Sequence, residues 1–187
     1  MRVITGTAKG CRLQTPAGYA VRPTSGIVKE AVFSALQFEI EGARVLDLFA
    51  GSGQMGIEAL SRGARSCVLV DNAKESLAAI RNNLAAAGLA AKAKVVAGDA
   101  PGFLRGYRGE YFDIAFLDPP YAAGLLVSAL GLLADKMSAS GVIICETDIS
   151  AGMDEQLHAP AEDFALVKKY RYGKTQVALY RRPGEEL

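Results

Sequence analysis

Residues 112–121 read Phe-Asp-Ile-Ala-Phe-Leu-Asp-Pro-Pro-Tyr, and this stretch decides the expected fold. Five of the six residues before Asp118 are apolar, which is typical of a strand buried in a sheet. Pro119 and Pro120 lack a backbone N–H and fix φ at about −65°, so the strand has to end at Asp118. In open α/β sheets ligands bind at the carboxyl ends of the strands. Asp118 is therefore expected at a binding edge.

The residues that end this strand have a chemistry suited to an exocyclic amine. The Asp118 carboxylate and the Pro119 carbonyl are neighbouring acceptors, which match the two N–H donors of such an amine. The ring of Tyr121, after Pro120, offers a flat face on which a nucleobase can stack. The alternative is a strand-ending turn with a core tyrosine, which is the usual fate of Asp-Pro pairs. These four residues are the candidate catalytic residues, and the alternative stays open.

A glycine-rich loop follows another short apolar run earlier in the chain. Gly51, Gly53 and Gly56 match the dinucleotide-binding fingerprint G-x-G-x-x-G. Asp71 lies 20 residues after Gly51, where a ribose-binding acid is expected. A nicotinamide-dependent oxidoreductase is therefore one hypothesis. Asp47, inside the preceding strand, completes an Asp-x-Phe-x-Gly-x-Gly pattern that resembles the S-adenosylmethionine loop, whose ligand is a sulfonium cation that an acid attracts rather than repels.

The charges are distributed unevenly along a chain of ordinary composition. The 187 residues, half of them apolar, fit one domain with a sizeable core. Residues 1–29 contain no acid and carry +5, and residues 168–182 contain no acid and carry +6. The rest of the chain carries −10, so the net charge is only +1. The two basic ends are either ordinary solvated surface or a site for a polyanion.

The cysteines and the single histidine give no basis for a metal site or a histidine-based mechanism. Cys11, Cys67 and Cys145 lack metal-type spacing, and the last two lie in apolar runs, so we expect buried thiols. His158 has no nearby partner in the sequence. No apolar segment approaches the roughly 18 residues of a membrane span, and the start lacks the apolar region of a signal peptide. We therefore expect a cytoplasmic protein without a metal.

Apolar periodicity predicts strands that alternate with helices. We expect helices over about 26–38, from the glycine loop to 62, over 73–87 with Asn72 as its cap, and over 124–136. We expect strands over 45–49, 67–70, 94–97, 112–117, 141–146, 164–171 and 175–182, with a turn at 172–174. This order predicts a mostly parallel seven-stranded sheet, with helices on both faces and an antiparallel C-terminal hairpin strand. The single domain, 1–187, begins with a basic β-hairpin and loop over 1–23.

Nearly the whole chain resembles the bacterial RsmD-type 16S ribosomal RNA guanine-N2 methyltransferases, which use S-adenosylmethionine. The resemblance rests on Arg2-Val3-Ile4 with Gly6, residues 9–13, 22–24, 29–33, 45–53, 58–64, 118–121 and 172–175. It implies a Rossmann-like methyltransferase fold, a monomer, and ribosomal RNA in the small subunit or its assembly intermediate as the partner. The family usually has an Asp-Arg pair where this chain has Gly26-Ile27, so the contribution of that arginine is missing here.

The resemblance also implies roles for individual residues. The cofactor-binding residues would be Asp47, Phe49, Ala50, Gly51, Gly53, Asp71, Asn72, Asp99 and Ala100. Asp71 would hold the ribose hydroxyls, and Asp99 or the backbone of Ala100 would meet the adenine, although Asp99 is equally suited to cap the turn after it. RNA would contact Lys9, Arg12, Arg22, Thr24, Lys169, Arg171 and Lys174. The alternatives are adenine-N6 methylation, a nicotinamide oxidoreductase and a non-catalytic RNA-binding assembly factor.

Overall fold

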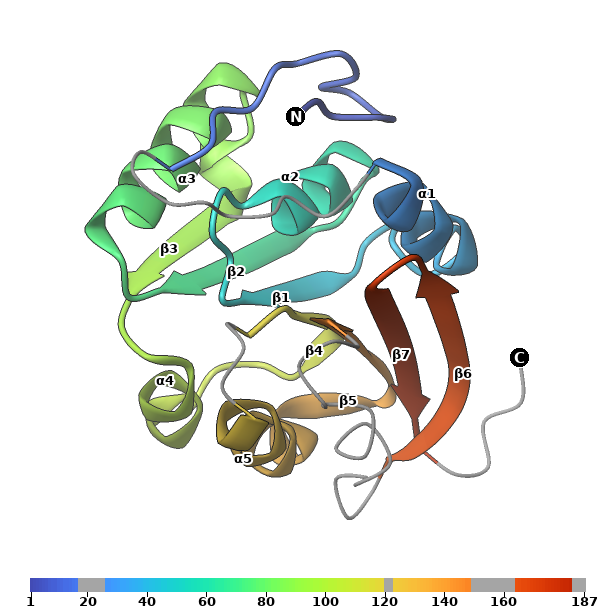
Figure 1. Ribbon diagram of the computed structural model, residues 1–187. Coiled ribbons are helices and arrows are strands. Elements are labelled where there is room, and N and C mark those ends of the chain that lie inside the picture. The colour runs from blue at the N-terminus through green and yellow to red at the C-terminus, as the bar shows by residue number, and fades with distance from the viewer. Residues whose placement is uncertain (17–25, 120–122, 149–163, 183–187) are drawn as a thin grey trace.

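The computed structural model describes residues 1–16, 26–119, 123–148 and 164–182. Its strands form one seven-stranded sheet in the order β3-β2-β1-β4-β5-β7-β6 (Figure 1). The strands are β1 (Arg44–Leu48), β2 (Ser66–Asp71), β3 (Ala93–Ala97), β4 (Phe112–Leu117), β5 (Met137–Asp148), β6 (Ala165–Tyr172) and β7 (Thr175–Arg181). Neighbouring strands from β3 to β5 are parallel, whereas β7 is antiparallel to both β5 and β6. The expected sheet is confirmed.

Helices cover both faces of this sheet. They are α1 (Gly26–Ala35), α2 (Gln54–Ser61), α3 (Lys74–Ala86), α4 (Ala100–Gly106) and α5 (Ala123–Leu133), with short 3-10 turns at Ala90–Lys92 and Ala134–Lys136. In Figure 1, α1, α2 and α3 lie on one side of the sheet and α4 and α5 on the other. Ile114 and Phe116 of β4 join the hydrophobic cluster of the first side, and Ala115 and Leu117 join that of the second. Both faces of β4 are buried, which explains its nearly continuous apolar run.

The strand register brings the ends of β1, β2 and β4 to one edge of the sheet. Leu48, the last residue of β1, pairs with Val70 on one side and with Leu117 on the other. The chain order of the strands reverses on either side of β1, and such a switch point is where ligands bind in open α/β sheets. The glycine loop, Asp71 and Asp118 therefore meet at this edge, which we call the carboxyl edge. The opposite edge is the amino edge.

The ends of α1, α2, α3 and α5 lie within three residues of the expected positions, but Asn72 is not the cap of α3. Gly63 and Gly88, after α2 and α3, have φ of 105° and 68°, a conformation that glycine adopts readily at helix C-termini. Asn72 does not cap α3, because the N-cap residue is Ala73 and no side chain caps it. Asp71 Oδ1 instead accepts the Ala73 N–H at 2.9 Å. The expected cap is wrong because α3 begins at Lys74, which places Ala73 at the N-cap position and Asn72 one residue before it.

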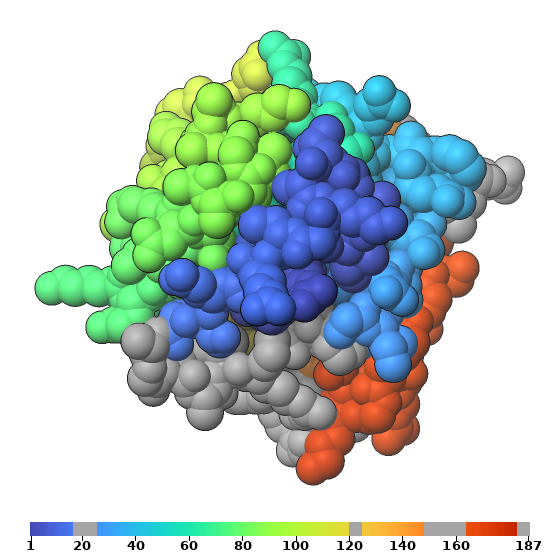
Figure 2. Space-filling view, turned by 90° about the horizontal axis from the view of Figure 1, so that it is seen from above, coloured from blue at the N-terminus to red at the C-terminus, as the bar shows by residue number. Residues whose placement is uncertain are grey.

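Residues 1–16 form a compact turn rather than a regular β-hairpin, and we call them the N-terminal segment. Among the described residues, one isolated antiparallel bridge, between Arg2 and Arg12, joins its two arms. The Val3 N–H donates to the Cys11 carbonyl beside it. In Figure 2 the segment, in blue, lies between the green atoms of α3 and the light-blue atoms of α1. The remainder of the expected extension, residues 17–23, lies outside the described residues.

Two further expectations can be compared with the structure. β5 begins four residues before the expected strand, because Met137 pairs with Phe112 ahead of a register shift in β4. Cys67 and Cys145 are buried, and all three cysteines are free thiols, as expected. Within the described part of the chain, no helix is long and apolar enough to cross a membrane.

Candidate active site

The loop between β1 and α2 needs its glycines for steric reasons. Gly51 and Gly53 have φ of 56° and 75°, and Phe49 before them has φ of 60°, which is unusual for a residue with a side chain. At Gly56, an added Cβ would lie 2.7 Å from the Cys67 sulfur. The fingerprint glycines therefore allow a tight turn and the close packing of α2 on β2. By themselves they do not select a pyrophosphate as the ligand.

Asp47 lies beneath this loop, with only 4% of its surface exposed. Its Oδ2 accepts the Gly56 N–H at 2.9 Å near the start of α2. Burial raises the pKa of Asp47, the Gly56 hydrogen bond lowers it and the charge of Asp71 raises it, so that the pKa is about 7. Asp47 thus holds the loop through its backbone, with its carboxyl group close to the crevice.

Asp71, the last residue of β2, holds the loop from the other side. Its Oδ2 accepts the Gly51 N–H at 2.8 Å, in addition to the bond from Ala73 to Oδ1. The Gly51 N–H, which would face a phosphate in a dinucleotide site, is therefore bound to a carboxylate. Each oxygen keeps a second lone pair, so the carboxylate can still accept hydrogen bonds from ribose hydroxyls.

Asp118 follows β4 at the same edge and is exposed to solvent, whereas Pro119 beside it is buried. Desolvation by the surrounding protein is the main effect that raises the pKa of Asp118 well above its ordinary value, and the charges of Glu146 and Asp47 raise it further. The residue nevertheless keeps part of its surface exposed to water. Glu146 lies near the end of β5. Three carboxyl groups are thus close enough to influence one another, which favours a cation at this edge.

Asp99 follows β3 and caps α4. Its Oδ1 accepts the Gly102 N–H at 2.7 Å, so the expected cap is confirmed. The Asp99 side chain is exposed, which leaves its other oxygen accessible to a ligand. Ala100, the next residue, is 3% exposed. A cofactor contact of these two residues remains a prediction.

The other candidate residues are less closely constrained. Ala50 is buried, and its N–H donates to the Val70 carbonyl at 3.0 Å, which ties the loop to β2. Asn72 is exposed beside Asp71. Four candidates lie outside the described residues and stay predictions: Arg22, Thr24, Pro120 and Tyr121.

The cations of the β6–β7 hairpin lie at the carboxyl edge. Lys169, Arg171 and Lys174 are exposed. Asp148, at the end of β5, pairs with Thr175 at the start of β7, so the turn between β6 and β7 lies beside the carboxyl end of β5. These charges are therefore placed next to the edge that carries Asp118.

The cations of the N-terminal segment are placed differently. Lys9 and Arg12 are exposed. The Ala8 N–H donates to Ser61 Oγ at 3.0 Å, and Ser61 is the last residue of α2, at the end away from the glycine loop. Lys9 therefore does not lie at the carboxyl edge, and the segment contacts the loop region through Met1 and Gln14 instead.

Three polar residues that organise this region were missed from the sequence. Glu146 is an acid near the end of a buried strand, the same signal that singled out Asp118. Glu58 in α2 and Asn83 in α3 are 0% and 1% exposed and bind the N-terminal segment. Both lie within helices, where no local pattern distinguishes them from surface residues.

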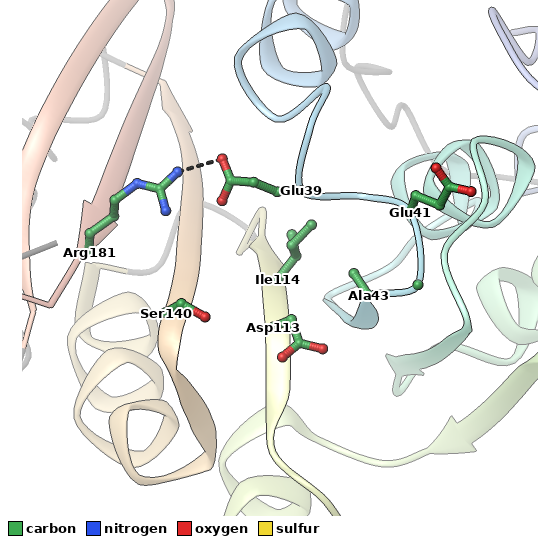
Figure 3. A pocket seen from close by; sticks show the side chains of 8 residues that line it. Glu39, Glu41, Ala43, Asp113, Ile114, Ser140 and Arg181 are labelled. Atoms are coloured by element: carbon green, nitrogen blue, oxygen red, sulfur yellow. Dashed lines mark hydrogen bonds and ion pairs between the residues drawn. The ribbon is translucent and has the colours of Figure 1, made fainter. Parts of the chain in front are cut away.

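A pocket of about 380 Å³ opens at the amino edge, away from the candidate site (Figure 3). Its lining residues are Glu39, Glu41, Gly42, Ala43, Asp113, Ile114, Ser140 and Arg181. Two of its acids are neutralised, because Arg181 binds Glu39 at 2.7 Å and Arg44 binds Asp113 at 3.3 Å. The third acid, Glu41, is exposed.

The fold and the site together define a methyltransferase of the Rossmann-like class. The solved structure described as "Putative methyltransferase yhhF from Escherichia coli" superposes with a TM-score of 0.84 and 32% identity over 99% of both chains. The chain belongs to the family described as Conserved hypothetical protein 95, whose model matches residues 1–181.

Curated relatives align over almost their whole length. "Putative rRNA methyltransferase YlbH" of Bacillus subtilis (strain 168) is 37% identical over 193 residues, which cover 98% of this chain and 100% of that protein. "Ribosomal RNA small subunit methyltransferase D" of Escherichia coli (strain K12) is 33% identical over 187 residues, which cover 99% of this chain and 91% of that protein.

Proposed function

We propose that this protein transfers a methyl group from S-adenosylmethionine to the exocyclic N2 amine of a guanine in 16S ribosomal RNA. The observation that carries the proposal is the position of Asp118 and Pro119 at the switch point of the sheet, beside a loop held by Asp47 and Asp71. The names of the curated relatives support the same activity and ribosomal RNA as the substrate.

Charge supports S-adenosylmethionine over a nicotinamide dinucleotide as the ligand of this loop. S-adenosylmethionine carries a sulfonium and an ammonium against one carboxylate, whereas a dinucleotide brings a pyrophosphate dianion. The carboxyl groups of Asp47, Asp71, Asp118 and Glu146 at the carboxyl edge attract the first ligand and repel the second. We therefore assign the glycine loop to S-adenosylmethionine, with Asp71 on the ribose and Asp99 or Ala100 at the adenine.

The bound cofactor supplies an electrophilic methyl group on its sulfonium sulfur. Asp118 and the Pro119 carbonyl accept the two N2 hydrogens of a guanine that has left its stack, at a cost of a few kcal/mol. We assign stacking on this base to Tyr121. These contacts direct the nitrogen lone pair at the methyl group, and orientation of this kind lowers a bimolecular barrier by roughly 7–11 kcal/mol. An ionised Asp118 also stabilises the positive charge that develops on the nitrogen, by about 3 kcal/mol.

The raised pKa of Asp118 gives the step a pH dependence. The ionised carboxylate is the stronger acceptor and the form that balances the developing charge, so activity rises with pH through a pKa above the ordinary range of aspartate. A carboxylate with a raised pKa is also the stronger base. It can accept the proton that the methylated, cationic nitrogen has to lose.

We propose that the two basic ends hold the RNA. The exposed Lys169, Arg171 and Lys174 lie beside the site, and Lys9 and Arg12 extend the positive surface along α2. Phosphate contacts of this kind position an RNA without reading its sequence. We place the protein in the cytoplasm as a monomer that acts on the small ribosomal subunit or its assembly intermediate.

A transfer assay tests the proposal. Small-subunit RNA and particles from a strain lacking the protein are incubated with labelled S-adenosylmethionine, and the nucleosides are identified by mass spectrometry. We expect N2-methylguanosine from the wild-type protein and none from Asp118→Ala. N6-methyladenosine would show an adenine methyltransferase, and RNA binding without transfer would show an assembly factor. Calorimetric binding of NAD in place of S-adenosylmethionine would show an oxidoreductase.

A further inference from the structure

Asn83 in α3 joins the N-terminal segment to the glycine loop and is 1% exposed. Its Nδ2 donates to the Ser52 carbonyl at 2.9 Å and to the Gln14 carbonyl at 3.0 Å. Its Oδ1 accepts the Gln14 N–H at 2.7 Å. Both amide hydrogens are thus used, and the backbone of Gln14 is held at two points, as a neighbouring strand would hold it.

Ser52 lies in the part of the loop whose shape decides cofactor binding. The Gly51 N–H on one side of it is bound by Asp71, and the Gly53 N–H on the other side donates to the Ala50 carbonyl at 2.7 Å. The peptide groups on both sides of Ser52 are therefore fixed by hydrogen bonds, and a displacement of Ser52 would disturb both of them. Ser52 Oγ also lies 3.8 Å from the Met1 sulfur, which is a second contact between the loop and the N-terminal segment.

The other end of the N-terminal segment is fixed to α2 without involving the loop. The fully buried Glu58 accepts the N–H groups of Ile4 and Thr5 at 2.8 Å and 2.9 Å, and Lys29 balances its charge at 2.9 Å. Ser61 Oγ donates to the Thr5 carbonyl at 2.6 Å. The segment is therefore anchored on α2 as well, and Asn83 hydrogen-bonds it to the backbone of the cofactor loop.

We propose that Asn83 is a positioning residue that couples cofactor binding to RNA binding. A cofactor that orders the glycine loop fixes Ser52 and, through Asn83, the N-terminal segment that carries Lys9 and Arg12. By linkage, RNA held by this segment raises the affinity for the cofactor by the same factor. The RNA part of the inference rests on the proposed function, whereas the coupling of loop and segment does not need RNA.

Amide hydrogen exchange tests the coupling without RNA. In the wild-type protein, S-adenosylmethionine should slow exchange of the Val3, Gly10 and Leu13 amides, which are hydrogen-bonded within the segment, by about fivefold or more. Asn83→Ala should abolish this cofactor-dependent change even at saturating S-adenosylmethionine. A wild-type segment that does not respond to the cofactor, or an Asn83→Ala segment that still responds, would overturn the inference.

Ser61→Ala is the matched control, because it loosens the same segment at its other end and leaves the link to the loop in place. Exchange of the segment should be faster throughout, yet the response to S-adenosylmethionine should persist. If Asn83→Ala folds poorly, Gln14→Pro removes the N–H that Asn83 accepts and leaves α3 unchanged. It should also reduce the response, and an undiminished response would contradict the proposal.

RNA affinity with and without S-adenosylmethionine tests the full coupling. The wild-type protein and Ser61→Ala should bind RNA about fivefold or more tightly with the cofactor, whereas in Asn83→Ala the ratio should fall to within about twofold of unity. An unchanged ratio in Asn83→Ala would overturn the coupling. Failure of the proposed function looks different, because charge reversal of Lys9 and Arg12 would then leave RNA affinity unchanged while the exchange response persists.

Discussion

Both the amino edge and the carboxyl edge of the sheet carry acidic side chains, but these acids bind different groups at the two edges. At the amino edge, acids are paired with arginines: Glu39 with Arg181 (Figure 3), and Asp113 with Arg44. At the carboxyl edge, Asp47 and Asp71 accept backbone N–H groups instead. None of the ion pairs formed between residues of the described ranges involves Asp47, Asp71 or Asp118.

The pKa values of the acids also differ between the two edges. Partial burial opposes the ionisation of Asp113, but hydrogen bonds from the Arg44 N–H and guanidinium lower its pKa. At the carboxyl edge burial raises the pKa of Asp47, and desolvation by the surrounding protein together with the charges of Glu146 and Asp47 raises that of Asp118. The number of acids therefore does not identify the active site. The edge at which Asp47, Asp71 and Asp118 form no ion pair with other described residues is the one prepared for a cationic ligand.

The largest expected effect comes from the acids at the two ends of β4. Asp118→Ala should lower turnover by at least about 10²–10³-fold, because it removes the acceptor for the developing charge, and should leave S-adenosylmethionine affinity within a few-fold. Asp113→Ala, at the amino edge of the same strand, should leave turnover within about twofold and lower only stability. Near-normal turnover of Asp118→Ala in a methyl-transfer assay would remove the distinction between the edges.

A smaller effect is expected on cofactor affinity. Asp71→Ala should weaken S-adenosylmethionine binding by about 1.5–3 kcal/mol, since it removes a charged acceptor from the ribose and also frees the Gly51 N–H. Glu39→Ala at the amino edge should lower stability by leaving Arg181 unpaired, without changing cofactor affinity. Calorimetric titration of both variants measures the effect. Equal affinities for the wild-type protein and Asp71→Ala would place the ribose contact elsewhere.

Charge reversal compares the two edges as RNA-binding surfaces. Lys169→Glu with Lys174→Glu should weaken RNA binding by about tenfold and flatten the slope of log K against log salt by about 0.7–0.9 for each phosphate that the variant no longer binds. Reversal of Arg12 should act in the same direction. Arg65→Glu with Lys92→Glu is the control, because these exposed residues precede β2 and β3 at the amino edge. Similar losses of affinity for both pairs, or none for either, would show that RNA does not prefer the carboxyl edge.

Elements with local signals were predictable from the sequence. The apolar residues of β4 and the two prolines after it were sufficient to predict this strand and its end. Gly173, with φ of 61°, marks the turn of the last hairpin, as expected. The glycine loop and the acids after β2 and β4 meet as expected because carboxyl ends of parallel strands share one edge.

Features that depend on distant partners were not predictable. The N-terminal segment lacks regular strands because its N–H and carbonyl groups bind side chains of α2 and α3: Glu58, Ser61 and Asn83. The expected cap at Asn72 failed because the helix begins one residue later than expected, with Asp71 holding the Ala73 N–H before its first turn. Since these partners are far apart in sequence or compete within one turn, residue type and spacing do not reveal them.

The last expected effect is a difference in how the two edges respond to pH. The folded-state pKa of Asp47 is raised to about 7, so the native state binds this proton more tightly than the unfolded chain does. The free energy of unfolding should therefore fall by about 2 kcal/mol between pH 5 and pH 7. Asp113 has a lowered pKa, so its contribution has the opposite sign and is lost as the pH falls below about 4.

Urea unfolding of Asp47→Asn across this pH range isolates the contribution of Asp47. The amide oxygen can still accept the Gly56 N–H, but the side chain no longer titrates, so the decline between pH 5 and pH 7 should disappear. Asp113→Asn should keep that decline and lose part of the stability gained above about pH 4. If the free energy of unfolding of Asp47→Asn declines between pH 5 and pH 7 as steeply as that of the wild-type protein, Asp47 does not hold its proton in the folded protein. Asp47 would then be ionised across this pH range and would add its full negative charge to the carboxyl edge.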